Sequence, residues 1–171
     1  MKITEPKIEE RAEQPYMGIR TEVTMQELGN GLVPQSLDEI FGWLEQQGIA
    51  PVGPPIMRFH VIDMECNLDV EIGVPVANAE AGNGRIQPNS LPAGRYAALV
   101  YTGVENGIPA NGALLDWGAK QGLVWDTFPS DKGDGFGARY ETLLMGPEDD
   151  PDPANWDSEV AIRLADEQSQ P

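Results

Sequence analysis

The sequence contains one stretch twice: residues 39–49 read EIFGWLEQQGI, and residues 113–123 read ALLDWGAKQGL. When the two stretches are aligned, three positions are identical: Trp43 with Trp117, Gln47 with Gln121 and Gly48 with Gly122. Apolar residues also align on either side of these positions. Such a repeat predicts a fold built from two copies of one small unit. The seam between two copies is a natural place for a ligand pocket.

The first copy has the pattern of an amphipathic helix. Ser36 and Glu39 have the spacing of a capping box, which predicts that the helix begins there. Apolar residues follow from Leu37 at intervals of three and four, as one buried stripe requires. Gly48 supplies the left-handed conformation that commonly ends a helix.

The second copy predicts a matching helix. Asn111 is the expected N-cap, and Gly122 is the expected stop. Gly118 stands where the first copy has Leu44. We therefore expect either a weaker helix or a group that packs closely against Gly118.

Extended segments flank both helices. The most regular is 68–76, where apolar residues alternate with Asp69, Glu71, Gly73 and Pro75, and Pro75 predicts an end or an edge. Segments 77–92, 132–137 and 146–153 are rich in Gly, Pro and acid and are predicted as connections. The predicted strands are 16–25, 54–61, 68–76, 95–102, 138–145 and 158–164.

These elements predict an α+β fold with a duplicated strand–helix–strand–strand unit and an antiparallel sheet. The length of 171 residues suits one domain over 1–171. We expect its first half at about 5–78, its second half at about 91–165, and a frayed tail at 166–171.

Composition excludes several classes of protein. Eleven Lys and Arg against 28 Asp and Glu give a net charge of −17, which would repel nucleic-acid phosphates. No apolar run approaches the roughly 20 residues of a membrane-spanning helix, and the N-terminus lacks a secretion signal. The single cysteine, Cys66, fits a reducing compartment. We therefore expect a cytoplasmic protein that binds neither nucleic acid nor membrane.

Three segments carry a resemblance to a known family: 69–76 (DVEIGVPV), 91–98 (LPAGRYAA) and 139–147 (RYETLLMGP). In this order and spacing they resemble the GyrI-like small-molecule-binding domain, which serves as the effector domain of AraC-type and MerR-type regulators and also occurs alone. The resemblance extends over roughly 5–165. It implies a ligand cleft between the two halves. Because the chain shows no DNA-binding segment, the standalone members are the better comparison.

The resemblance also implies a binding residue. The family often has a carboxylate six residues before the proline that ends its fifth strand, and counting back from Pro147 gives Glu141. In multidrug-sensing members this acid meets the positive charge of lipophilic cations. Two residues later the family usually has a tyrosine, where this sequence has Leu143. Judged without the resemblance, an acid in a strand is most often a solvated surface residue.

Aromatic side chains are the expected walls of the cleft, because their faces stack on ligands and attract cations. The alternative for each of them is ordinary packing in the core or at the surface. The preferred ligand-binding set is Tyr16, Tyr101, Trp117 and Trp125, with Phe59 and Phe136 behind it.

Three functions remain open. The first is a non-enzymatic protein that binds lipophilic or aromatic ligands, cations among them, with Glu141 as the polar contact. The second is a hydrolase of cyclopropane-bearing genotoxins, with Glu141 as the acid and Tyr101 or His60 assisting. The third is an interaction protein that resembles gyrase inhibitors. A lone histidine is usually structural, and a dyad of His60 with Cys66 lacks an orienting acid.

No cofactor and no metal are expected. The acidic run at 148–152 lacks the spacing and the glycine of a calcium loop. The partner implied by the sequence is a small molecule, and any protein partner is left unspecified. Transcriptional control would need a separate DNA-binding partner.

Overall fold

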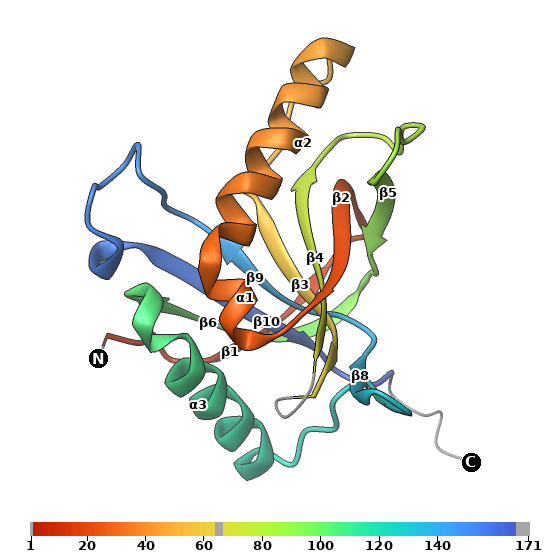
Figure 1. Ribbon diagram of the computed structural model, residues 1–171. Helices are drawn as coiled ribbons and strands as arrows, with labels where there is room; N and C mark the ends of the chain where they lie inside the picture. Colours follow the sequence, from red (N-terminus) through yellow and green to blue (C-terminus); the bar gives the residue numbers. More distant parts are fainter. Residues whose placement is uncertain (1, 64–66, 167–171) are drawn as a thin grey trace.

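The structure is a computed structural model that describes residues 2–63 and 67–166. Cys66, which was considered and set aside as a dyad partner of His60, lies outside these residues. One ten-stranded sheet joins both halves of the sequence, and two long helices lie against it (Figure 1). The expected α+β class is therefore confirmed.

All strand pairs in this sheet are antiparallel, and the order along its main path is β1-β6-β10-β9-β3-β4-β2-β5. A short hairpin of β7 and β8 joins the sheet at β3. The strands are β1 (Lys7–Arg11), β2 (Gln14–Val23), β3 (Ile56–Ile62), β4 (Leu68–Pro75), β5 (Ile86–Leu91), β6 (Gly94–Thr102), β7 (Thr127–Ser130), β8 (Gly133–Phe136), β9 (Arg139–Leu143) and β10 (Asp157–Arg163).

The two long helices occur at equivalent places in the two halves, each between the first and second strand of its unit. The first half has α1 (Met25–Glu27), the turn η1 (Leu28–Leu32) and α2 (Val33–Gln47); the second has η2 (Val104–Asn106), α3 (Gly107–Lys120) and, later, η3 (Pro153–Asn155). The predicted unit is confirmed as β2-α2-β3-β4 and β6-α3-β9-β10. The centre of the sheet is the pair β3 and β9, where the two halves meet.

Four strands were not predicted. Segment 77–92 contains β5, and segment 132–137 contains β8, although both were expected to be connections. β1 and β7 are also additional. These strands are short and lack an alternating apolar pattern, so pairing with a neighbour rather than local sequence defines them.

The first helix begins earlier than the capping-box pattern predicts. α2 begins at Val33, and Ser36 lies inside it, buried with a side-chain hydroxyl that has no partner among the described residues. Glu39 instead forms an exposed ion pair with Arg85. The capping box in this region joins Thr24 and Glu27 one element earlier. The end of the helix is as predicted, because Gly48 has φ 69°.

The second helix also begins before its predicted cap. Asn111 lies inside α3, where its side-chain amide donates to the carbonyl of Gly107 at 2.8 Å. Gly122, at φ 71°, follows the helix as expected. Gly118 is explained by close packing, since a Cβ atom there would lie 2.2 Å from the ring of Trp125.

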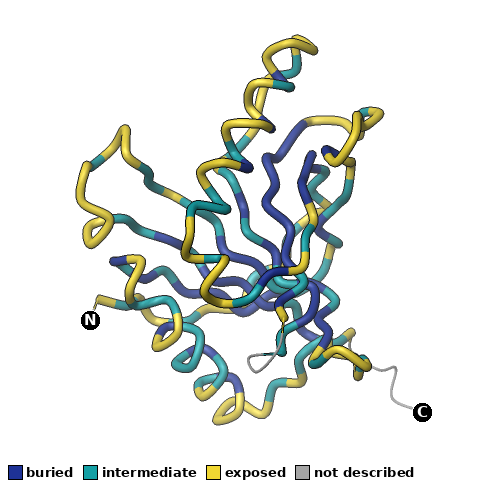
Figure 2. Tube along the Cα trace, in the orientation of Figure 1, coloured by how far each residue is buried: buried dark blue, intermediate teal, exposed yellow. Residues whose placement is uncertain are grey.

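Both helices cover the same face of the sheet. α2 packs through Ile40 and Leu44 on a core that includes Ile19 and Ile72, and the repeated Trp43 adds to its edge. α3 packs through Ala110 and Leu114 on a second core that includes Leu99, Val160 and Ile162, with Trp117 at its edge. Figure 2 shows the buried strands beneath the exposed outer sides of the helices.

The opposite face carries a core of its own. Its buried residues are mostly aromatic or small, and they come from several strands. They are Tyr16, Ile56, Leu91, Tyr96, Ala98, Ala138, Tyr140 and Ala161. Within residues 2–63 and 67–166, no helix is long and apolar enough to cross a membrane.

Candidate functional site

A cavity of about 1120 Å³ lies between the helical segments of the two halves, over the central strands β3 and β9. We call it the cleft. One wall comes from α1, η1 and α2, including Leu28, Leu37 and Phe41. The other comes from η2 and α3, including Ile108 and Leu115. The cleft therefore forms at the seam between the two halves, where neither α2 nor α3 covers the sheet.

Its rim is unusually apolar for a protein surface. Five large apolar side chains that remain exposed lie along it, namely Met25, Phe41, Val104, Ile108 and Leu144. Exposed apolar side chains gathered around a concavity are typical of a ligand site.

The floor of the cleft contains one acid in an apolar row. Strand pairing aligns six residues across the helix-covered face, one from each of six strands: Ile19, Ile72, Met57, Glu141, Val160 and Leu99. Five of these side chains are apolar. Glu141 takes the central position on β9, directly opposite Met57 on β3.

Glu141 is 6 % exposed and accepts a hydrogen bond from the hydroxyl of Tyr101. Burial raises the pKa of Glu141 above its usual range, and the Tyr101 hydrogen bond, the nearby charge of Arg139 and the side chain of Asn111 oppose that rise only in part. The carboxyl can therefore stay protonated at a higher pH than a surface glutamate, and it can be ionised by a cation placed beside it.

Four of the predicted site residues line the cleft together. Glu141 and Leu143 come from β9, Tyr101 from β6 and Phe59 from β3. Leu143, in the position where the family usually has a tyrosine, adds an apolar surface next to Glu141.

Tyr16 and His60 lie on the opposite face of the sheet. The Tyr16 hydroxyl donates to Glu71 at 2.5 Å and accepts from Arg58 at 3.1 Å. The His60 ring nitrogen Nε2 lies 2.8 Å from the same Glu71 oxygen. β3 has an irregular register between Phe59 and Val61, and the contacts there place the two side chains apart: Phe59 lines the cleft, whereas His60 contacts Glu71. Neither Tyr16 nor His60 can contact Glu141 from there.

The remaining three aromatic residues do not line the cleft. Trp117 and Trp125 pack at the edge of the α3 core, Trp125 against Gly118. Phe136 lies beneath the guanidinium of Arg139, whose central carbon is 4.8 Å from the ring centroid. Their positions match the core-packing alternative that applied to each aromatic residue.

The cleft also contains residues that the sequence analysis did not select. Met57 faces it from β3, and Asn111 and Arg139 face it from α3 and β9. Arg139 was recognisable, because it lies two residues before Glu141 in a strand and must share its face. Met57 and Asn111 depend on the β3–β9 pairing and on the packing of α3, which the sequence does not reveal.

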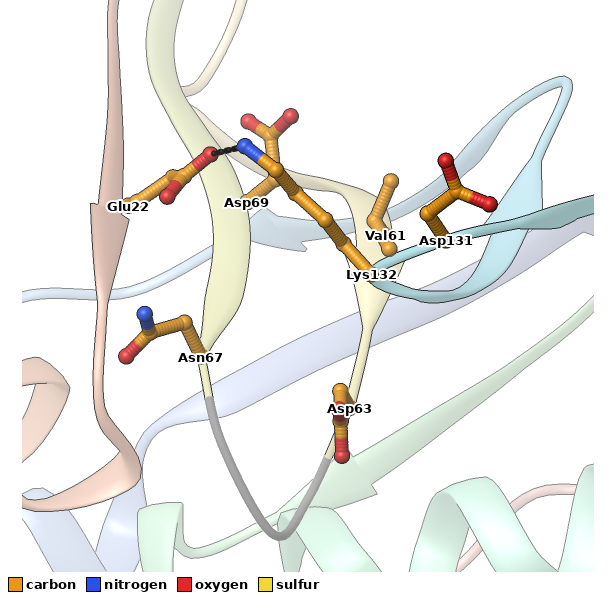
Figure 3. A pocket seen from close by; sticks show the side chains of 7 residues that line it. All are labelled: Glu22, Val61, Asp63, Asn67, Asp69, Asp131 and Lys132. Atoms are coloured by element: carbon orange, nitrogen blue, oxygen red, sulfur yellow. Dashed lines mark hydrogen bonds and ion pairs between the residues drawn. The ribbon is translucent and has the colours of Figure 1, made fainter.

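A second, smaller cavity of about 230 Å³ lies away from the cleft (Figure 3). It is lined mainly by acids, and the ammonium group of Lys132 forms an ion pair with Glu22 at 2.7 Å across it. Among the residues described, no three His, Cys, Asp or Glu side chains gather closely enough to hold a metal ion.

Solved structures share this fold. The chain matches EcmrR in a complex with DNA at TM-score 0.73 and 17% identity, over 94% of this chain and 57% of that one. It thus spans little more than half of that protein. The isolated EcmrR C-terminal domain matches at TM-score 0.68 and 15% identity, covering 95% and 98% of the two chains.

A third structure, SAV2435 bound to tetraphenylphosphonium, matches at TM-score 0.58 and 10% identity, covering 95% of this chain and 94% of that one. No curated protein matches the sequence. At these identities the structures establish the fold alone. The sequence model of the GyrI-like small molecule binding domain matches residues 4–165, nearly the whole chain, and the protein therefore belongs to that family.

Proposed function

We propose that this protein binds lipophilic aromatic small molecules, cations among them, in the cleft, with Glu141 as the polar contact. The observation that carries the proposal is the single acid at the centre of an otherwise apolar row, at the floor of the cleft. A buried carboxylate with few donors is costly unless a cation or donor meets it. A ligand cation would meet that need, and the apolar walls would cover the rest of the ligand.

One structural neighbour, SAV2435, was solved with tetraphenylphosphonium, a lipophilic aromatic cation. This ion is a suitable first probe, because its charge does not depend on pH and it has no hydrogen-bonding group. Its binding therefore reports the charge and the apolar surface of the cleft alone.

The test is titration calorimetry of tetraphenylphosphonium with the native protein and with Glu141→Gln. We expect the affinity to fall about tenfold or more in the variant, since contacts to a charged group contribute about 1.5–3 kcal/mol. The matched control is Glu148→Gln, which removes the same charge from an exposed residue of the same cleft. Its affinity should change by no more than about twofold, because solvent screens an exposed charge. Equal affinities in the native protein and Glu141→Gln would remove Glu141 from the site.

A second function is favoured by the contact between Tyr101 and Glu141. A buried carboxyl with a raised pKa can act as a general acid. In hydrolysis of a cyclopropane conjugated to a carbonyl, Glu141 would protonate the carbonyl oxygen while water bonds to a ring carbon and a ring C–C bond breaks. The proton lost by the water would return to Glu141. His60 is on the wrong face to assist.

This alternative is tested by following loss of such a substrate by chromatography. Catalysis predicts many turnovers per protein molecule, abolished in Glu141→Gln and reduced in Tyr101→Phe. Binding alone predicts that substrate disappears from solution only up to one equivalent and is recovered intact after denaturation of the protein.

A further inference from the structure

Glu141 has a basic neighbour on the floor of the cleft. Arg139 lies two residues earlier in β9 and also lines the cavity. Two residues of one strand face the same side with Cα atoms about 6.6 Å apart. The floor of the cleft therefore presents a carboxyl group and a guanidinium group side by side.

The Arg139 guanidinium is only partly used by the protein. Its Nη2 donates to the Asn111 side-chain oxygen at 2.9 Å, and its flat face lies over Phe136. Its Nε is buried without a hydrogen-bond partner among residues 2–63 and 67–166. Within the same residues no carboxylate forms an ion pair with it.

The arginine on the other face of the sheet shows the difference. Arg58 also has a buried Nε without a hydrogen-bond partner among the described residues, but it uses both terminal nitrogens, Nη1 on Tyr16 and on the carbonyl of Ser90, and Nη2 on the carbonyl of Gly137. Arg139 lines the cleft and uses only Nη2, and its Nη1 donates no hydrogen bond to another side chain or carbonyl within residues 2–63 and 67–166. Burial lowers the pKa of Arg139, with Glu141 acting in the opposite direction, but an arginine stays charged at neutral pH.

The Arg139 guanidinium can donate to an acceptor on a ligand, whereas the Glu141 carboxylate can meet a cationic group on the same ligand. Phe136 and Asn111 hold the guanidinium in place, so an acceptor on a ligand would find it already oriented. A ligand carrying only a positive charge would meet Glu141 favourably but would be repelled by Arg139.

We propose that the cleft prefers zwitterionic aromatic ligands, whose cationic group lies by Glu141 and whose carboxylate accepts from Arg139. This inference rests on the proposed function, because it assigns a second polar contact to the same cleft. Arg139 is then the residue that decides between a zwitterion and a simple cation of the same shape.

Two dyes provide a close comparison. Rhodamine 110 has a free carboxylate, and rhodamine 123 is its methyl ester, with the same cationic aromatic core. Fluorescence anisotropy at neutral pH should give an affinity for rhodamine 110 about tenfold higher than for rhodamine 123, as one charge-assisted hydrogen bond supplies. Equal affinities of the native protein for the two dyes would overturn the proposal without any variant.

Variants then assign the preference to a residue. In Arg139→Met the two dyes should bind with about equal affinity. Arg139→Lys keeps the charge and should retain part of the preference for rhodamine 110. Arg85→Met removes an exposed arginine that pairs with Glu39 and should leave the preference unchanged. Glu141→Gln should weaken both dyes by a similar factor. A preference that persists in Arg139→Met would also overturn the proposal.

The proposed function and this inference can fail separately. If tetraphenylphosphonium binds but the two rhodamines bind alike or not at all, the role of Arg139 is refuted while the cleft remains a site for cations. If none of the three probes binds, the proposed function is wrong and the inference fails with it.

Discussion

Two buried glutamates lie on opposite faces of the sheet, Glu71 on β4 and Glu141 on β9, and they are almost equally enclosed, at 3 % and 6 % exposure. One oxygen of Glu71 accepts from Tyr16 and Asn89 and lies within hydrogen-bond distance of His60. Glu141 accepts a hydrogen bond from Tyr101 and faces a cavity.

The pKa of each carboxyl follows from these surroundings. Burial pushes the pKa of Glu71 upward, but the hydrogen bonds from His60 and Tyr16 outweigh it, and the pKa lies below its ordinary value. For Glu141 burial dominates and the pKa is raised. Burial of an acid therefore does not mark a functional site by itself. The informative feature is burial without enough donors, next to a space that a ligand can fill.

The largest expected effect is on stability, and it should separate the two acids. Glu71→Gln removes the charge from the Tyr16, His60, Asn89 and Arg58 network, and we expect the free energy of unfolding to fall by about 3 kcal/mol. Glu141→Gln should change it by no more than about 0.5 kcal/mol, because that site already favours the neutral form. Urea unfolding followed by tryptophan fluorescence measures both. Equal losses in the two variants would contradict the comparison.

The two tyrosines that donate to the acids should differ in the same direction. Tyr16→Phe leaves Glu71 short of a donor and Arg58 short of an acceptor, so we expect a loss of about 1.5 kcal/mol. Tyr101→Phe should cost about 0.5 kcal/mol, since its partner can take up a proton. A larger loss of unfolding free energy in Tyr101→Phe than in Tyr16→Phe, measured in the same assay, would contradict this expectation.

The pH dependence of stability should have opposite signs for the two acids. Glu71 has a lowered pKa, so its contribution is present above the ordinary glutamate pKa and is lost as the pH falls through the lowered value. Glu141 has a raised pKa, so it costs stability increasingly as the pH rises above the ordinary value.

Unfolding free energies measured at several values between about pH 3 and pH 7 test these signs, because the Glu71 contribution is lost below the ordinary glutamate pKa. The native protein and Glu71→Gln should converge toward low pH. The native protein and Glu141→Gln should converge toward low pH as well, but Glu141→Gln should become the more stable of that pair as the pH rises. Parallel curves for either pair would contradict the assignment for that residue.

Local sequence was sufficient for the elements that local interactions determine. The duplicated helices and their glycine ends were predictable, because the apolar stripe and the glycine that ends each helix depend on residues of that helix alone. Their beginnings were not, because the pattern at Ser36 matches a cap but the chain was already helical from Val33. Edge strands such as β5 were missed, since pairing with β2 rather than alternation defines them.

The site was predictable only in part. The choice of Glu141 as the polar contact rested on its spacing to Pro147 and on the family resemblance. Neither of these indicates that its side chain points into the cleft. Tyr16 was expected in the cleft because both it and its neighbour Met17 are large and suited to burial, so the sequence does not say which side of β2 faces the helices. The donors around Glu71 come from β2, β3 and β5, and only the strand order brings them together.

The central claim is that Glu141, and not another acid, gives the cleft its charge. The most direct measurement is the affinity for tetraphenylphosphonium as a function of pH between about pH 5 and pH 8. Because this cation does not titrate, we expect the affinity of the native protein to rise as Glu141 ionises and the affinity of Glu141→Gln to be low and independent of pH. A native profile that is flat, or one that Glu141→Gln reproduces, would contradict the claim.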